Sequence, residues 1–338
     1  MRKILSIALF VSFVFMVKPV SADFFGTLFG DGGGGAKGEI SPAPWSGDWW
    51  PRKKGFMIKG WPGHPVAPFE KYDQYVTIRA GVNPGTLAWE SDVRNCHYNP
   101  KAEDWEGHCN GWAASSIMEP EPKERKIRSE IVFDTSDQKA ILAELYMNTY
   151  CTFYGSRNWG RPNDNPEDIF PDQFHKLLLE QIGEKKGAII ADVSYDRQVW
   201  NFPLFKFESS WRPAFFDSKK LKVTTTCYYA DDGVRPDFIG CKWFTITYTY
   251  NLFIDNEDNV VGGEWTGESR RNHPDFIWIP TADAPNPSGK VEENPNFSPK
   301  YVHEITKGPA NANYQEPATP SSPESLLTDA GLNPGDLF

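Results

Sequence analysis

One cysteine stands in a setting that suits a nucleophile. Cys109 follows Gly107 and His108, and it precedes Asn110, Gly111 and an apolar segment that can start a helix. A helix N-terminus carries about half a positive charge, which favours the thiolate over the thiol. The small neighbours let another backbone, or a substrate carbonyl, approach the sulfur closely. Cys109 is therefore the candidate nucleophile, and a buried structural or disulfide cysteine is the alternative interpretation.

The other cysteines are predicted to pair. The chain has five, and an odd number leaves at least one thiol unpaired within the molecule. Cys227 and Cys241 flank a turn signal at 231–233 and are predicted to form a disulfide, which leaves Cys96 and Cys151 as the second pair. No CxxC or HExxH spacing is present, so the motifs predict no zinc site.

The elements that must position Cys109 follow from local patterns. A helix is expected from Cys109 to Met118, ending at the Glu-Pro-Glu-Pro run 119–122. Further helices are expected at 137–150 and 171–183, and strands at 187–193, 223–229, 243–254 and 260–265. Helices come first and strands later, so the predicted class is α+β, with the cysteine-bearing helix packed on an antiparallel sheet. That order is also typical of papain-like cysteine hydrolases and transferases.

The N-terminus has the pattern of a secretory signal peptide over residues 1–22. Arg2 and Lys3 precede an apolar run at 4–17, and Val20-Ser21-Ala22 resembles a signal-peptidase site. The run is shorter than the ~20 residues that span a bilayer, so cleavage before Asp23 is favoured over a membrane anchor. We expect a secreted or periplasmic protein without stable membrane insertion.

The remaining chain divides by composition. Residues 23–70 are rich in Gly, Trp and Pro and form either a propeptide-like cover over the active cleft or a stably packed arm. Residues 71–280 are the predicted catalytic domain, and 281–338 are a predicted disordered tail rich in Pro and Ser. The net charge of −10, without a long basic run, argues against nucleic-acid binding.

Three separated blocks resemble the transglutaminase elicitor family of Phytophthora and some bacteria. They are Trp-Glu-Gly-His-Cys-Asn-Gly-Trp-Ala at 105–113, Val-Trp-Asn-Phe-Pro-Leu at 199–204, and a block from Ile254 to Trp278 that contains Gly-Gly-Glu-Trp and His-Pro-Asp-Phe. The second block matches the family's elicitor core, Val-Trp-Asn-Gln-Pro-Val, except at Phe202 and Leu204.

The resemblance implies a papain-like enzyme that joins a glutamine side chain to a primary amine, usually lysine, with release of ammonia. The expected function is that of a protein-glutamine γ-glutamyltransferase, with proteins bearing glutamine and lysine as partners. A thiolate divides the reaction into two easier steps through a thioester on Cys109. Water in place of the amine would give a papain-like cysteine peptidase or glutamine deamidase. The second alternative is a non-catalytic secreted binding protein.

Several residues compete to be the base. Papain-like enzymes take their base from the strand-rich half, which favours His273 with Asp275 as its orienting carboxylate. His175 is the second choice for the base, and Glu264 and Asp192 are the runners-up for the carboxylate. A dyad of cysteine and carboxylate without histidine is also open.

Other residues are expected to hold the substrate. Trp105, Trp112 and Trp200 are candidates for aromatic walls that keep water from the thioester, and simple core packing is the alternative for each. Asn201 in the elicitor core joins them as a candidate substrate-binding residue.

Calcium is the one candidate cofactor. The acidic loop around Asp255, Asn256 and Asp258 offers oxygen ligands, but it lacks EF-hand spacing.

Overall fold

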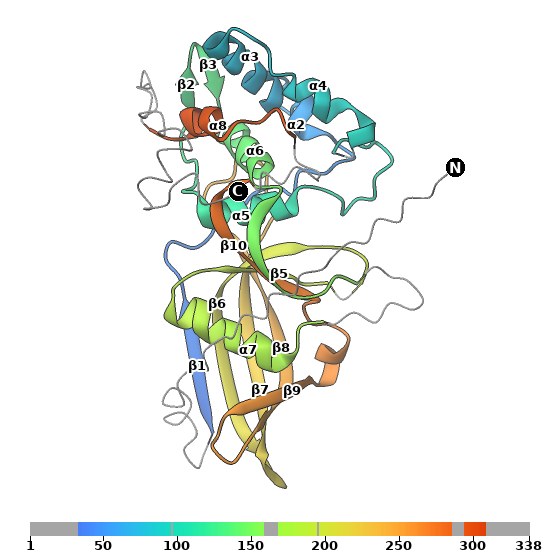
Figure 1. Cartoon of the computed structure of the whole chain (residues 1–338), viewed down its shortest axis with the longest axis vertical. Coiled ribbons are helices and arrows are strands. Elements are labelled where there is room, and N and C mark those ends of the chain that lie inside the picture. Colours follow the sequence, from blue (N-terminus) through green and yellow to red (C-terminus); the bar gives the residue numbers. More distant parts are fainter. Residues whose placement is uncertain (1–32, 96, 159–167, 195, 286–293, 309–338) are drawn as a thin grey trace, which may run out of the picture.

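The structure is a computed structural model that describes residues 33–95, 97–158, 168–194, 196–285 and 294–308. The predicted signal peptide and most of the predicted tail lie outside these residues. The described part is elongated: most helices gather at one end and a large sheet forms the other, with the cysteine-bearing helix between them (Figure 1). No helix in the described part is long and apolar enough to cross a membrane.

The sheet has eight strands, and every pair in it is antiparallel. Its order is β4-β10-β5-β6-β7-β8-β9, and β1 pairs with the far end of β6. The strands are β1 (Gly34–Glu39), β4 (Thr149–Gly155), β5 (Ile189–Asp192), β6 (Asn201–Ala214), β7 (Asp217–Ala230), β8 (Trp243–Ile254), β9 (Val260–Trp265) and β10 (Phe276–Pro285).

The α-helices of the described part gather at the helical end of the molecule, except α7, which packs against β8 and β9 (Figure 1). They are α2 (Phe56–Lys59), α3 (Pro68–Ala80), α4 (Thr86–Ser91), α5 (Cys109–Met118), α6 (Thr135–Leu145), α7 (Pro171–Leu177) and α8 (Pro299–Thr306). A π-helical segment, η2 (Leu178–Glu184), continues α7, and η1 (Val93–Asn95) and η3 (Gly267–Arg270) are short 3₁₀ turns. The small hairpin of β2 (Lys126–Arg128) and β3 (Ile131–Phe133) lies beside α8 and α3.

Strand β6 links the site to the sheet because its sequence alternates. Phe205, Phe207 and Trp211 are buried, whereas Glu208 and Arg212 face solvent. Side chains of a strand alternate between its faces, so one face of β6 packs into the core. The first residues of β6, from Asn201, are buried on both faces because α5 packs over this end.

Helix α5 is held closely against α6. A Cβ atom added at Gly111 would lie only 2.0 Å from the backbone oxygen of Ala143, so only glycine fits there. Trp112 is fully buried, and its Nε1 donates a hydrogen bond to the backbone oxygen of Trp45. Asp134 and Asp137 form a capping box that fixes the start of α6, the helix that contacts Gly111.

Many sequence predictions of the fold are confirmed. The α+β class is correct, and α5, β8 and β9 have the predicted bounds. Helix α6 is shorter than predicted, because the chain has already entered β4 at Thr149. Residues 171–183 form α7 and most of η2.

One segment differs from expectation because tertiary contacts hold it. Helix α8 lies within the segment predicted as a disordered tail, where Val302 and Ile305 are buried in the core.

In the N-terminal arm, Trp45 and Trp50 are 3% and 1% exposed and belong to the main core. These contacts favour the stably packed arm over a removable cover.

Candidate active site

Cys109 borders a cavity at the junction of helices and sheet. Its volume is about 420 Å³, and its walls include Arg52, Trp105, Cys151, Asn201 and Trp278. Since Cys109 is the first residue of α5, the N–H groups of the first helical turn, which lack intrahelical partners, lie beside its sulfur.

The side chain of Asn201 is aimed at the thiol. Asn201 Nδ2 lies 3.7 Å from Cys109 Sγ, and the indole Nε1 of Trp278 donates to Asn201 Oδ1 at 2.8 Å. The thiol itself points to the backbone oxygen of Val199 at 3.7 Å. Trp278 therefore fixes the amide so that an N–H group faces the sulfur.

The resting thiol is protonated. Burial raises the pKa of Cys109 to about 11, and hydrogen bonds from Asn201 oppose that effect only in part. The negative fields of Asp232 and Asp192 raise the pKa further. The expected depression of the pKa at the helix N-terminus is outweighed by burial, so a reaction at Cys109 needs a proton acceptor.

Asp192 lies on the same side of the sheet as Asn201. The two residues are directly paired across β5 and β6, and paired residues of antiparallel strands project from the same face. Asp192 Oδ1 accepts hydrogen bonds from the N–H of Trp200 at 2.8 Å and from Ser194. Its Oδ2 is buried and has no hydrogen-bond partner among the described residues, and burial raises the pKa of Asp192 to about 6.

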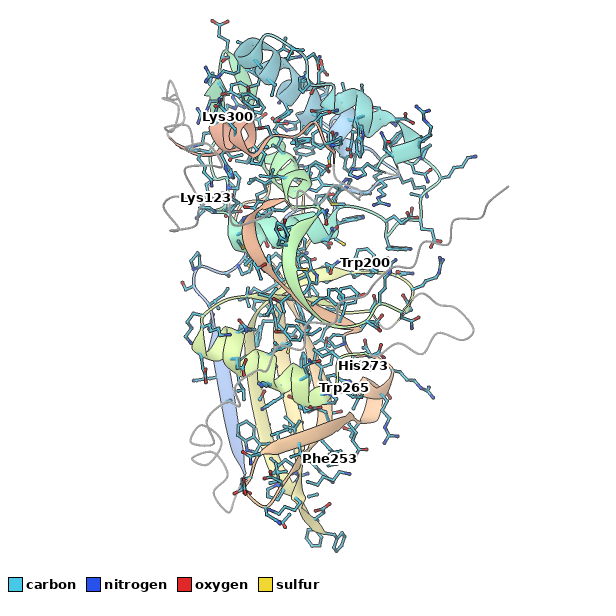
Figure 2. All side chains as sticks on the ribbon, in the orientation of Figure 1. Lys123, Trp200, Phe253, Trp265, His273 and Lys300 are labelled. Atoms are coloured by element: carbon cyan, nitrogen blue, oxygen red, sulfur yellow. The ribbon has the colours of Figure 1, made fainter. Side chains whose placement is uncertain are left out.

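His273, the first choice for the base, packs at a different place. Its ring stacks on Trp265 with centroids 4.9 Å apart, and Nδ1 lies 2.7 Å from the backbone oxygen of Ser269. Nε2 lies 3.4 Å from Asp168 Oδ2. Figure 2 shows His273 beside Trp265, toward the sheet end of the molecule from Trp200. His273 is not one of the residues that line the cavity.

The other candidates for the base and the carboxylate, like His273, form hydrogen bonds or ion pairs with residues other than Cys109. Asp275 accepts a hydrogen bond from the N–H of Asn158, and burial raises its pKa to about 7. His175 Nδ1 lies 2.6 Å from the hydroxyl of Tyr250 in the sheet core, where burial lowers its pKa to about 4. Glu264 pairs with Lys220 at 2.7 Å.

No histidine is among the described residues that line the cavity. His108, the neighbour of Cys109, has Nδ1 3.1 Å from the backbone oxygen of Trp50, and its Nε2 faces Glu144 in the interior. Neither nitrogen is directed to the sulfur. Asp192, only a runner-up in the sequence, does not line the cavity itself, but strand register brings this carboxylate to the side of Asn201, which does.

The three tryptophans have different positions. Trp105 lines the cavity, as an aromatic wall would. Trp112 has no exposed surface, so its place is core packing behind α5. Trp200 stacks parallel to Phe202 at 6.3 Å and does not line the cavity.

The predicted disulfide between Cys227 and Cys241 is not formed. Cys227 is buried within β7 opposite Ile246, whereas Cys241 precedes β8 and directs its thiol to the backbone oxygen of Lys242. Cys151 is also a free thiol, and its proposed partner Cys96 lies outside the described residues. Nothing in the sequence indicated that Cys151 would face the same cavity as Cys109.

The acidic loop is closed by its own backbone. Asp255 Oδ1 accepts from the N–H groups of Glu257 and Asn259 at 2.8 and 2.9 Å, and Lys219 Nζ lies 3.9 Å from Asp258. In this turn, the carboxylate of Asp255 already accepts hydrogen bonds from two backbone N–H groups.

Comparison with known proteins identifies the family. The model of the transglutaminase elicitor family matches residues 97–215 and 219–293, which include Cys109, Asp192 and Asn201. The fold is similar to the crystal structure of the GP42 transglutaminase from Phytophthora sojae, with a TM-score of 0.63 and 19% sequence identity over 80% of this chain and 90% of that one. A search of curated proteins finds no match. With more than half of its length matched by the family model, this chain belongs to the transglutaminase elicitor family.

Proposed function

We propose that this protein is an exported protein-glutamine γ-glutamyltransferase that works through a thioester on Cys109. The observation that carries the proposal is the position of Cys109 at the start of α5, beside the cavity and facing the amide of Asn201. Family membership and the fold shared with a transglutaminase support the same reaction class. The substrates are proteins that offer a glutamine carboxamide and a lysine amine.

In the acylation step, the carboxylate of Asp192 takes the thiol proton as Sγ bonds to the carboxamide carbon. Backbone N–H groups at the start of α5 and Asn201 Nδ2 are suited to donate to the oxygen that becomes negative. The C–N bond then breaks, the proton passes to the leaving nitrogen, and ammonia departs. A lysine amine attacks the thioester, loses a proton to Asp192, and releases the isopeptide and the thiol.

The choice between amine and water depends on the cavity walls. Trp105, Phe276 and Trp278 supply apolar surface around the thioester position. Such surface favours the alkyl stem of a lysine and limits the water that would hydrolyse the intermediate.

The test is incorporation of fluorescent cadaverine into casein by the mature protein. Cys109→Ala should abolish incorporation, whereas Cys151→Ser, which changes the other thiol of the same cavity, should retain it. Loss of activity in Cys151→Ser with retention in Cys109→Ala would overturn the assignment. Ammonia release without cadaverine incorporation would identify a deamidase.

A further inference from the structure

Four ionisable side chains meet in the interior behind the start of α5. Glu90 comes from α4, His97 from the loop after η1, His108 from the residue before α5, and Glu144 from α6. Each is at most 2% exposed. One ligand atom from each can be chosen so that all four lie within 4.8 Å of one another.

The ring nitrogens face the carboxylates at separations close to those between the ligands of one ion, with His97 facing one oxygen of Glu144 and His108 facing the other. His97 Nδ1 lies 3.4 Å from His108 Nε2 and 3.4 Å from Glu144 Oε1. It lies 3.2 Å from Glu90 Oε1 and 3.0 Å from Glu90 Oε2. His108 Nε2 lies 3.3 Å from Glu144 Oε2 and 3.4 Å from Glu90 Oε1. Ligands bound at zinc distances in a tetrahedron are about 3.3–3.5 Å apart, whereas charge-assisted N–H···O bonds are about 2.7–2.9 Å long.

The surroundings orient the imidazole of His108 and the carboxylate of Glu144, whereas the outer Nε2 of His97 is buried and has no hydrogen-bond partner among the described residues. The Nδ1–H of His108 donates to the backbone oxygen of Trp50 at 3.1 Å, which leaves a lone pair on Nε2 directed at the cluster. The backbone N–H of Asn294 donates to Glu144 Oε1 at 2.9 Å. Such outer contacts fix the tautomer and the carboxylate orientation in metal sites.

One atom of the cluster lacks the partner that an ion would supply. Glu144 Oε2 is buried and forms no hydrogen bond with the described residues, although it lies 3.3 Å from His108 Nε2. The facing nitrogens of His97 and His108 also limit how the cluster can be protonated. If both were protonated, two N–H groups would point at each other across 3.4 Å.

We propose that Glu90, His97, His108 and Glu144 form a structural site for one divalent transition metal ion, with Zn²⁺ as the best fit. Two neutral imidazoles and two carboxylates balance the charge of a dication, and an N₂O₂ set suits zinc. Six-coordinate ions would need added water ligands, for which this buried position is poorly suited. The ion would join α4, α6 and the loop after η1 to His108, and so fix the backbone that carries Cys109.

The test uses the untagged mature protein with Cys109→Ala, so that the nucleophile cannot bind the probe. We expect about one zinc per chain after purification without chelators, measured by elemental analysis. Removal of the ion should lower Tm by about 5 °C or more, and added Zn²⁺ should restore it. Co²⁺ in its place should give the visible spectrum of a tetrahedral site without a thiolate charge-transfer band.

Two isosteric variants and a control locate the ion. Glu90→Gln and Glu144→Gln should weaken Zn²⁺ binding by at least about 100-fold. Glu304→Gln alters an equally buried glutamate, which bonds to Tyr75 and Arg79 outside the cluster, and should leave binding unchanged.

The proposal would be overturned if the protein with the unaltered cluster, once freed of metal, failed to bind Zn²⁺. It would also be overturned if Glu90→Gln and Glu144→Gln both still bound Zn²⁺ as tightly. The four groups would then be an ion-pair network of imidazoliums and carboxylates. If the glutamine variants do not fold, the proposal is still tested by the zinc content per chain and the Co²⁺ spectrum of the protein that carries only Cys109→Ala. Neither readout depends on transferase activity.

Discussion

At the scale of single residues, the proposed chemistry depends on where the proton of Cys109 goes. Burial holds the pKa of the thiol at about 11, so the group is a poor nucleophile until its proton is removed. Asp192 is suited to accept it, because its unpaired Oδ2 lies in a buried site on the same face as Asn201. A raised pKa also makes this carboxylate a stronger base than an exposed one.

The first prediction concerns Asp192. A base must be ionised, so turnover should rise with pH through the pKa of Asp192, about 6. Asp192→Asn should lower kcat by about 10²–10⁴ and remove that limb of the profile. The amide oxygen can still accept from Trp200, so the fold should be kept. The measurement is the pH dependence of initial cadaverine incorporation.

His273 provides the contrasting case. Its ring is stacked on Trp265 and bonded to Ser269, so His273→Ala should lower Tm and leave the turnover of the folded enzyme nearly unchanged. If His273→Ala instead lost turnover on the scale given above and Asp192→Asn did not, the histidine favoured by the sequence would be the base.

At the scale of elements, the site depends on the close contact of α5 with α6. The contact sets how far the start of α5 extends toward β6, and therefore where Sγ lies relative to Asn201. Gly111 makes it possible, since the position of its missing Cβ is occupied by the backbone oxygen of Ala143.

The second prediction follows from this contact. Gly111→Ala should destabilise the protein by about 1–3 kcal/mol, because backbone cannot move aside as a flexible side chain can. It should also lower activity by displacing α5. Gly187→Ala is the matched control, since nothing lies within 4 Å of its Cβ position. Thermal unfolding with parallel activity assays measures both effects, and equal behaviour of the two variants would contradict the argument.

At the scale of the whole molecule, the N-terminal arm ties the helical end to the sheet. Strand β1 lies on β6, and Asp48 forms a bridge with Gly233 in the connection between β7 and β8. Asp48 Oδ1 accepts the N–H of Trp50 at 2.6 Å, and burial raises the pKa of this carboxyl to about 7. The arm is therefore a pH-sensitive part of the fold.

The third prediction concerns this sensitivity. Burial raises the folded pKa of Asp48 well above that of an exposed aspartate, so its stabilisation is complete below about pH 4 and is lost as the pH rises through about 7. Between about pH 4 and pH 8, the wild type should lose roughly 4 kcal/mol more free energy of unfolding than Asp48→Asn. Denaturant unfolding at several pH values measures the difference. The exposed variant Asp217→Asn should keep the wild-type slope.

The sequence by itself determined the local elements and the family. Periodicity and turn residues set the bounds of α5, β8 and β9, because helix and strand patterns are written in neighbouring residues. The three separated blocks at 105–113, 199–204 and 254–278 pointed to the family that the comparison later matched. The candidate nucleophile also came from a local signal, a cysteine at a helix start.

Only the tertiary structure decided which side chains meet. Strand register placed Asp192 beside Asn201, whereas His273 turned to Trp265. Packing of four separate segments gathered Glu90, His97, His108 and Glu144, whose spacing fits no metal motif. Burial, which depends on the whole fold, outweighed the helix field at Cys109. Side-chain direction and desolvation arise from contacts between distant segments, and a local sequence pattern carries no measure of either.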